Sequence, residues 1–183
     1  MGSLIQKRII MEELKKKASE SEVIMTEMVL PNDTNTLNHI MGGRLLHLMD
    51  IAAAVAAQRH SNKVVVTASV DNVSFREPIE LGNVITLKAK VTRSFNSSME
   101  VYIIVTTEDI PSKKKTISNS SFYTFVAVDE QGNPSGVPEL IPETKKEKEM
   151  YDNALMRRQL RLVLANRMKP EDATEIKSIF VNS

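Results

Sequence analysis

Asp50 is the residue with the clearest chemical potential, because it stands in the middle of a strongly apolar segment. Between Leu45 and Ala57 the only polar residues are His47 and Asp50, and the segment predicts a helix from about Gly43 to Gln58. A helix that is apolar all round is buried, and an unpaired buried carboxylate is costly. Asp50 is therefore either a structural residue that hydrogen-bonds a loop or a functional carboxylate under a ligand cleft.

Two adjacent glycines, Gly42 and Gly43, stand where this helix begins. The first backbone N–H groups of a helix have no partner within it and lie at the positive end of its dipole, where an oxyanion or a carbonyl oxygen can bind. Taken alone, the pair fits better with a tight loop before a closely packed helix.

Other common catalytic and metal-binding patterns are missing from the sequence. The three histidines, His39, His47 and His60, lack the spacing of a helical metal pair, and there is no H-E-x-x-H, G-x-S-x-G, P-loop or G-x-G-x-x-G motif. The chain has no cysteine, which excludes disulfides, thiolate metal sites and a cysteine nucleophile. We expect no metal and no cofactor.

Composition limits the classes of partner. The chain has 183 residues with 24 basic and 23 acidic side chains, so its net charge is +1. Nothing in this balance suggests a nucleic-acid or membrane-surface partner. No apolar run has the length of a membrane span, and the first residues lack the pattern of a signal peptide. We therefore expect a cytoplasmic protein.

The helix that carries Asp50 is embedded in a chain of predicted strands. Residues 1–22 read as a helical arm, with an amphipathic helix or mobile segment over 3–20, and residues 143–183 as a C-terminal helix, to about Met168, with a frayed tail. The domain between them, 23–142, contains the central helix. Its predicted strands are 23–30, 63–76, 84–93, 99–108 and 116–129.

The pattern of one apolar helix followed by antiparallel strands predicts an α+β fold. In residues 84–93 apolar and polar side chains alternate, so one face of the sheet is buried and the other is wet. The alanines at 52–54 and 56–57 allow a sheet to approach the helix closely. We expect a curved antiparallel sheet wrapped around the helix, the hotdog arrangement. The alternative is another α+β domain whose sheet is covered on one face.

The helix and the loop before it also resemble a known family. The stretch PNDTNTLNHIMGGRLLHLMDIAAAVAAQRH, followed by VVTASVDNVSFREPIELGNVITLKAKVTRSFNSSMEVYIIV and FYTFVAVDEQGNPSGVPELIPET, resembles the hotdog-fold acyl-CoA thioesterases of the acyl-CoA hydrolase family. The resemblance covers roughly residues 25–145. It implies hydrolysis of acyl-CoA to a free acid and CoA, with CoA as part of the substrate and not a cofactor.

The resemblance also implies roles for particular residues. Asp50 corresponds to the helix carboxylate that acts as general base or nucleophile, and Asn35 to a loop residue that assists it. Activation of water and attack to form an anhydride both remain open. The Gly42–Gly43 region is the candidate oxyanion site. The resemblance further implies dimers grouped into a hexamer, with Asn35 of one chain facing Asp50 of its neighbour.

Two further segments are candidates for binding CoA. By resemblance, Thr67, Ala68 and Ser69 would pair along a strand edge with the pantetheine amides. The turn that contains Arg93, Asn96, Ser97 and Ser98 offers a cation and hydroxyls suited to phosphates. Taken alone, this turn is better explained as an ordinary polar hairpin turn.

Two other functions remain open. A hotdog dehydratase or hydratase would act on the same thioesters, but such enzymes use a His with an Asp, and none of the three histidines stands in a matching motif. The chain could instead be a non-catalytic hotdog module that binds acyl-CoA and regulates another process. The presence of both Asn35 and Asp50 argues against a module without activity.

Overall fold

The computed structural model describes residues 15–71, 73–75 and 77–181, which form two compact units. The first unit ends at Ile141 and the second begins at Pro142.

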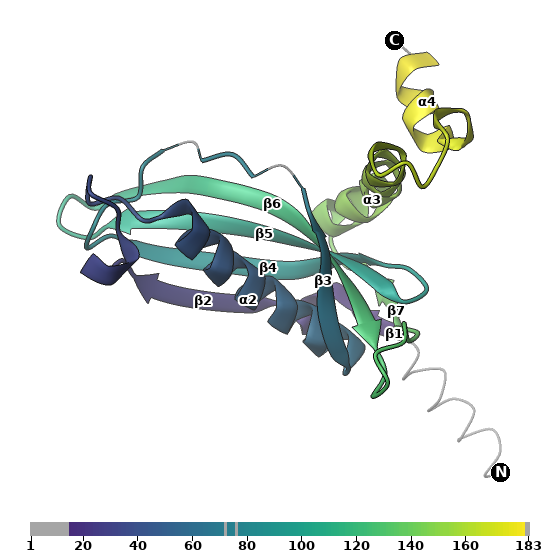
Figure 1. The fold of residues 1–183 in the computed structure, drawn as a ribbon, viewed down its shortest axis with the longest axis horizontal. Helices are drawn as coiled ribbons and strands as arrows, with labels where there is room; N and C mark the ends of the chain where they lie inside the picture. Colours follow the sequence, from purple (N-terminus) through teal and green to yellow (C-terminus); the bar gives the residue numbers. More distant parts are fainter. Residues whose placement is uncertain (1–14, 72, 76, 182–183) are drawn as a thin grey trace. The chain divides into compact units, whose positions relative to one another are not determined.

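The first unit is built on a five-stranded antiparallel sheet (Figure 1). Its strands lie in the order β2-β4-β5-β6-β3, so β2 and β3 form the two edges. Four of the five predicted strand segments match within about two residues at each end, and the fifth, β3, ends early. The strands are β2 (Val23–Met28), β3 (Val64–Val70), β4 (Val84–Ser94), β5 (Ser98–Asp109) and β6 (Lys114–Val128).

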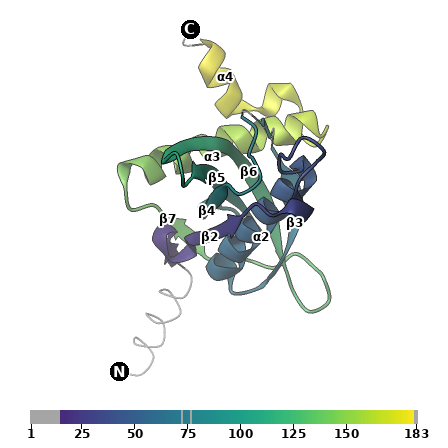
Figure 2. The same ribbon diagram turned by 90° about the vertical axis from the view of Figure 1, so that its left-hand side faces the viewer.

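A single long helix, α2 (Gly42–Ser61), lies along one face of this sheet and contacts all five strands (Figures 1 and 2). Its alanines at 52, 53, 56 and 57 are completely buried, so the small side chains let the sheet approach the helix axis. The buried side chains of the sheet face the helix; examples are Leu87, Ile103 and Phe125. The expected hotdog arrangement is confirmed.

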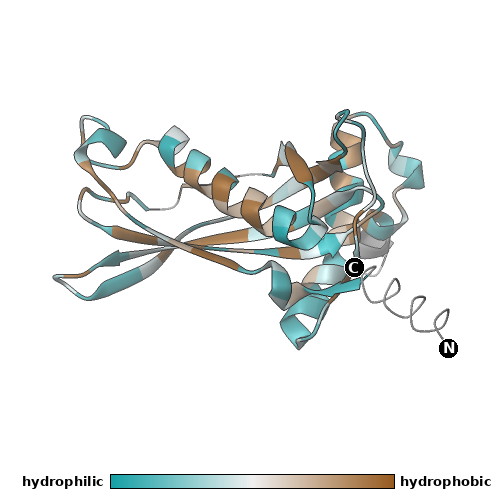
Figure 3. Cartoon of the chain, turned by 90° about the horizontal axis from the view of Figure 1, so that it is seen from below, coloured by the Kyte–Doolittle hydropathy of each residue, from teal (hydrophilic) through white to brown (hydrophobic). Residues whose placement is uncertain are grey.

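The outer side of α2 differs from the sequence-based expectation. The apolar composition predicted a helix with no face toward water, but His47, Ile51 and Gln58 are exposed, with Ile51 39% accessible. Figure 3 shows polar and apolar bands alternating along the helix. Composition alone does not specify which side of a helix the sheet covers.

A small second sheet was not predicted. Strand β1 (Lys15–Lys17) pairs in parallel with β7 (Glu139–Ile141), and a 3₁₀ turn, Ala18–Ser21, follows β1. Most of the helix expected over 3–20 lies outside the described residues. The described lysines are extended because pairing with a distant strand outweighs their local preference for helix.

The strand expected over 63–76 ends at Val70. A bulge between Thr67 and Ser69 already interrupts its pairing with β6. Beyond Val70 the Asp71 N–H donates to the Phe122 carbonyl oxygen at 2.9 Å, and the described residues that follow, 73–75 and 77–78, form an irregular segment. This irregular segment leaves room for two clefts beside α2.

The second unit contains helices α3 (Lys145–Leu164) and α4 (Thr174–Val181), with a 3₁₀ turn at Pro170–Asp172. Thr144 and Glu147 form a capping box at the start of α3. The expected C-terminal helix is thus present, but α4 occupies part of the expected frayed tail. Among the described residues, no helix is both long enough and apolar enough to cross a membrane.

Candidate active site

Helix α2 holds Asp50 at the wall of an open cleft of about 540 Å³. Asp50 is half-buried, and its Oδ1 accepts a hydrogen bond from Thr67 Oγ1 on β3 at 2.8 Å. The cleft is lined by Gly43, Leu46, His47, Asp50, Val70, Asp71, Val73 and Tyr123. Asp50 therefore combines features of the structural and the functional interpretation. It accepts a hydrogen bond from a neighbouring strand, and it lines a cleft that can admit a ligand.

The first turn of α2 presents free donors toward this region. The Met41 carbonyl oxygen accepts hydrogen bonds from the N–H groups of Arg44 at 2.9 Å and Leu45 at 3.0 Å. Within the part of the chain that is described, the N–H groups of Gly42 and Gly43 have no acceptor. Because Gly43 lines the same cleft as Asp50, a helix N-terminus and a carboxylate share one cavity.

Tyr123 adds a third functional group to the cleft. Burial, and after it the negative charge of Asp50, raises the pKa of the Tyr123 hydroxyl to about 12. The phenol is therefore protonated at neutral pH, where it can act as a hydrogen-bond donor.

Asn35 lies in the loop before α2, and the loop fixes the orientation of its side chain. Its Oδ1 accepts hydrogen bonds from the N–H groups of Leu37 at 2.9 Å and His39 at 3.2 Å. The amide nitrogen has no hydrogen-bond partner among the described residues. Asn35 is exposed and does not line the cleft of Asp50 in its own chain.

An ion pair anchors this loop to α2. Arg44 Nε donates to Asp33 Oδ1 at 2.7 Å, and the Leu30 N–H donates to the other carboxylate oxygen at 3.1 Å. The Leu30 N–H is the main cause that lowers the pKa of Asp33; burial opposes it, and the hydrogen bond and charge of Arg44 lower the pKa further. Asp33 stays ionised, so the loop and the first turn of the helix are held together at neutral pH.

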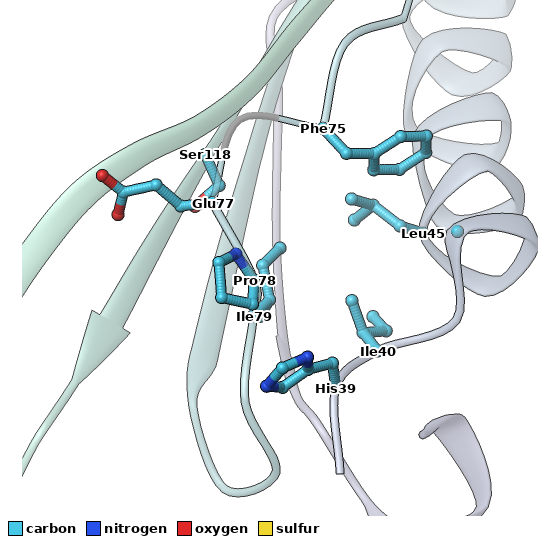
Figure 4. A pocket seen from close by; sticks show the side chains of 9 residues that line it. His39, Ile40, Leu45, Phe75, Glu77, Pro78, Ile79 and Ser118 are labelled. Atoms are coloured by element: carbon cyan, nitrogen blue, oxygen red, sulfur yellow. The ribbon is translucent and has the colours of Figure 1, made fainter. Parts of the chain in front are cut away.

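A second cleft, of about 310 Å³, lies at the start of α2 and has a different set of lining residues (Figure 4). Its wall is mainly apolar, with polar groups from His39, Glu77 and Ser118; the remaining lining residues are Ile40, Gly42, Leu45, Phe75, Pro78 and Ile79. A Cβ atom on Gly42 would come within 3.2 Å of Phe75 Cζ, so this glycine allows the Phe75 ring to lie directly over the backbone.

The candidate CoA-binding residues lie outside the two clefts. Thr67, Ala68 and Ser69 belong to the edge strand β3, where the bulge leaves Ala68 without a ladder partner. The turn between β4 and β5 is bound to its surroundings: the Ser97 carbonyl oxygen accepts from the Ala127 N–H at 2.9 Å, and Asn96 from the Val137 N–H at 3.0 Å. Ser98 is 9% accessible. Arg93 lies over the Phe95 ring, 5.8 Å from its centroid.

Sequence reasoning missed two members of the Asp50 cleft. Tyr123 and Asp71 lie outside α2 and carry no motif of their own. Tyr123 belongs to a strand with regular apolar alternation, so its pattern indicates only core packing. Thr67 was considered for CoA binding, but its hydrogen bond to Asp50 depends on the register of β3 with β6. Among the described residues, no cluster of three or more His, Asp or Glu side chains is arranged to hold a metal ion.

A curved antiparallel sheet around one long helix, with a carboxylate and free helix N–H groups in one cleft, defines the hotdog class of thioester enzymes. Comparison with known proteins agrees: residues 37–113 match the thioesterase superfamily. An acyl-CoA thioester hydrolase of Bacillus subtilis, itself uncharacterized, is 39% identical over 138 residues, which cover 75% of this chain and 80% of that protein. A human cytosolic acyl coenzyme A thioester hydrolase is 35% identical over 73% of this chain, which spans 36% of that protein.

Solved structures give the same assignment. A hexameric acyl-CoA thioesterase without ligand has a TM-score of 0.80 and 40% identity, covering 82% of this chain and 97% of that one. An acyl-CoA hydrolase from Staphylococcus aureus, solved with butyryl coenzyme A, coenzyme A and coenzyme A disulfide, has a TM-score of 0.77 and 36% identity, covering 90% and 99%. The chain belongs to the thioesterase superfamily, among its acyl-CoA hydrolases.

Proposed function

We propose that this protein hydrolyses acyl-CoA thioesters to a free carboxylic acid and CoA, with Asp50 as general base or nucleophile. The observation that carries this proposal is the geometry of one cleft: Asp50, held by Thr67, shares it with the free N–H of Gly43. Because cytosolic hydrolases are among its relatives, we also propose that it acts in the cytoplasm.

The two groups supply the two requirements of thioester hydrolysis. The N–H of Gly43, at the positive end of the helix, stabilises the negative charge that develops on the carbonyl oxygen. Asp50 either takes a proton from the attacking water or attacks the carbonyl carbon itself. In both routes CoA leaves as its thiol, and the oxygen atom of water becomes part of the carboxylic acid product.

The Staphylococcus aureus hydrolase supports the choice of residues. It has been solved as three variants, in which an asparagine, an aspartate and a threonine are each replaced by alanine; the asparagine variant holds coenzyme A. The spacing of those three positions along the chain equals the spacing of Asn35, Asp50 and Thr67 here. This agreement favours one functional set that includes Thr67.

We propose that Asn35 acts on the Asp50 of a neighbouring copy. Its amide nitrogen is a donor with no acceptor among the described residues of its own chain. Strand β3 is a free sheet edge beside Asp50 and exposes Val64, Val66 and Val70, which are 66%, 49% and 44% accessible. An exposed apolar edge strand is a ready site for pairing with a second copy. Since the similar solved thioesterase is hexameric, we propose dimers grouped into a hexamer.

The second cleft is the candidate site for the acyl chain. If the thioester carbonyl binds at Gly43, the acyl chain would extend from the carbonyl carbon past Gly42 and the Phe75 ring. The mainly apolar wall and the volume of about 310 Å³ suit a short or medium alkyl chain. Pantetheine would then follow Thr67, Ala68 and Ser69, and the CoA phosphates would meet the turn with Arg93, Asn96, Ser97 and Ser98.

The function is tested by measuring CoA release from acyl-CoA substrates of increasing chain length. Wild-type protein should release CoA from at least one of them. Asp50→Asn keeps the shape and removes the proton acceptor, so kcat should fall by about two to four decades with little change in KM. Binding without release for every substrate would favour a regulatory module, and full activity in Asp50→Asn would return Asp50 to a structural role.

A further inference from the structure

Tyr123 on β6 carries a hydroxyl that the fold leaves without a partner. Its side chain is 1% accessible, and its ring stacks on Phe125 with a centroid distance of 6.2 Å and an interplanar angle of 12°. The hydroxyl oxygen is buried and has no hydrogen-bond partner among the described residues. Buried hydroxyls are nearly always paired, so an orphan of this kind calls for an explanation.

The register of the sheet and the lining of the cleft place Tyr123 beside Asp50. Thr67, which donates to Asp50 Oδ1, lies opposite Phe125, while Val70 lies opposite Tyr123. Tyr123, Val70 and Asp50 line the same cleft. Burial, and after it the charge of Asp50, raises the pKa of Tyr123, so the orphan is a protonated donor close to a carboxylate.

Asp50 can accept another donor. Within the described residues its side chain has one hydrogen bond, from Thr67 to Oδ1, and Oδ2 has none. The terminal torsion of an Asp side chain is soft, so a small adjustment of the carboxylate is inexpensive. When an acyl-CoA fills the cleft, Tyr123 offers Asp50 a buried hydroxyl that has no other partner among the described residues.

We propose that Tyr123 is a positioning residue, whose hydroxyl donates to the second carboxylate oxygen of Asp50 in the substrate complex. Thr67 and Tyr123 then hold one oxygen each, which fixes the orientation of the carboxylate and favours its ionised form. This inference rests on the proposed role of Asp50 in hydrolysis.

Tyr123→Phe tests the proposal, because it removes the hydroxyl and keeps the ring on Phe125. A hydrogen bond to a charged group contributes roughly 10- to 100-fold. We expect kcat to fall by about this factor with KM unchanged, and the acid limb of kcat against pH, which reports the substrate complex, to move up by about one unit. In an Asp50→Asn background, Tyr123→Phe should cause no further loss.

Tyr102→Phe is the matched control, since Tyr102 packs on Phe122 at 5.0 Å and lines neither cleft. It should leave both kcat and its pH dependence unchanged. A Tyr123→Phe variant with the kcat and pH profile of the wild type would overturn the proposal, even if loss of the unpaired hydroxyl raised its Tm. A fall in kcat without a shift of the acid limb would overturn it as well. An extra loss in the Asp50→Asn background would do the same. A wild-type enzyme that releases no CoA would instead refute the proposed function, and this inference with it.

Discussion

At the scale of residues, the position of Asp50 beside a cleft was predictable, because its environment in the sequence is unusual. A single carboxylate within an apolar helix requires either a partner or a cavity, and the structure provides both. The partner itself was not predictable. Thr67 reaches Asp50 through the pairing of β3 with β6, and a shift of one residue would turn its hydroxyl to the other face.

His60 links α2 to the segment before β7 and makes stability depend on pH. Its Nε2 donates to the Pro138 carbonyl oxygen at 2.8 Å, and its buried Nδ1 has no partner among the described residues. A proton added to Nδ1 would therefore be buried without an acceptor. Burial is the main cause that lowers the pKa of His60, assisted by the charge of Lys16, while the bond to Pro138 opposes it.

This lowered pKa predicts a loss of stability in acid. The unfolded chain binds the proton more readily than the folded protein does, so the contribution of His60 is complete above its ordinary pKa of 6.5. It declines as the pH falls from there toward the lowered value. His60→Gln keeps a donor for Pro138 and takes up no proton. Urea unfolding from pH 8 to pH 5 should show a weaker pH dependence in the variant, and equal curves would exclude His60 as the cause.

At the scale of elements, the central helix and the alternating strands followed from hydrophobic periodicity, which is a local property. The features that shape the site depend on contacts between distant segments. The sequence placed a strand over 63–76, but β3 ends at Val70, and the Asp71–Phe122 hydrogen bond is its last backbone contact with β6 among the described residues. The β1–β7 pair could likewise not be predicted, because neither three-residue strand shows an alternation of apolar and polar side chains.

The irregular segment after β3 should control which acyl chains bind. Phe75 lies over Gly42 in the second cleft, so Phe75→Ala should enlarge the cleft at its entrance. Each further buried CH₂ contributes about 0.8 kcal/mol. We expect the ratio of kcat/KM for decanoyl-CoA to that for butyryl-CoA to rise about tenfold.

Ile110→Ala is the control for this prediction, because Ile110 is 58% accessible in the turn after β5 and lines neither cleft. It should leave the chain-length profile unchanged. An equal loss of activity for all chain lengths in Phe75→Ala would place the acyl chain elsewhere.

At the scale of the whole molecule, a single chain exposes apolar side chains on two of its elements. The edge of β3 exposes three valines, and the outer side of α2 exposes Ile51. Covering these groups removes apolar surface from water, which favours association. Light scattering at micromolar concentration should therefore give the mass of an oligomer, with six chains expected. A monodisperse monomer would rule out a site shared between copies.

The shared site is tested most directly by exchanging subunits between two inactive variants, Asn35→Ala and Asp50→Asn. A labelled-subunit control must first show that exchange occurs. In a mixed dimer, one of the two equivalent sites receives both defects and the other receives neither. Random exchange makes about half of the dimers mixed, so about a quarter of wild-type CoA release should return. If exchange is complete and no activity returns, Asn35 and Asp50 of different chains do not form the site.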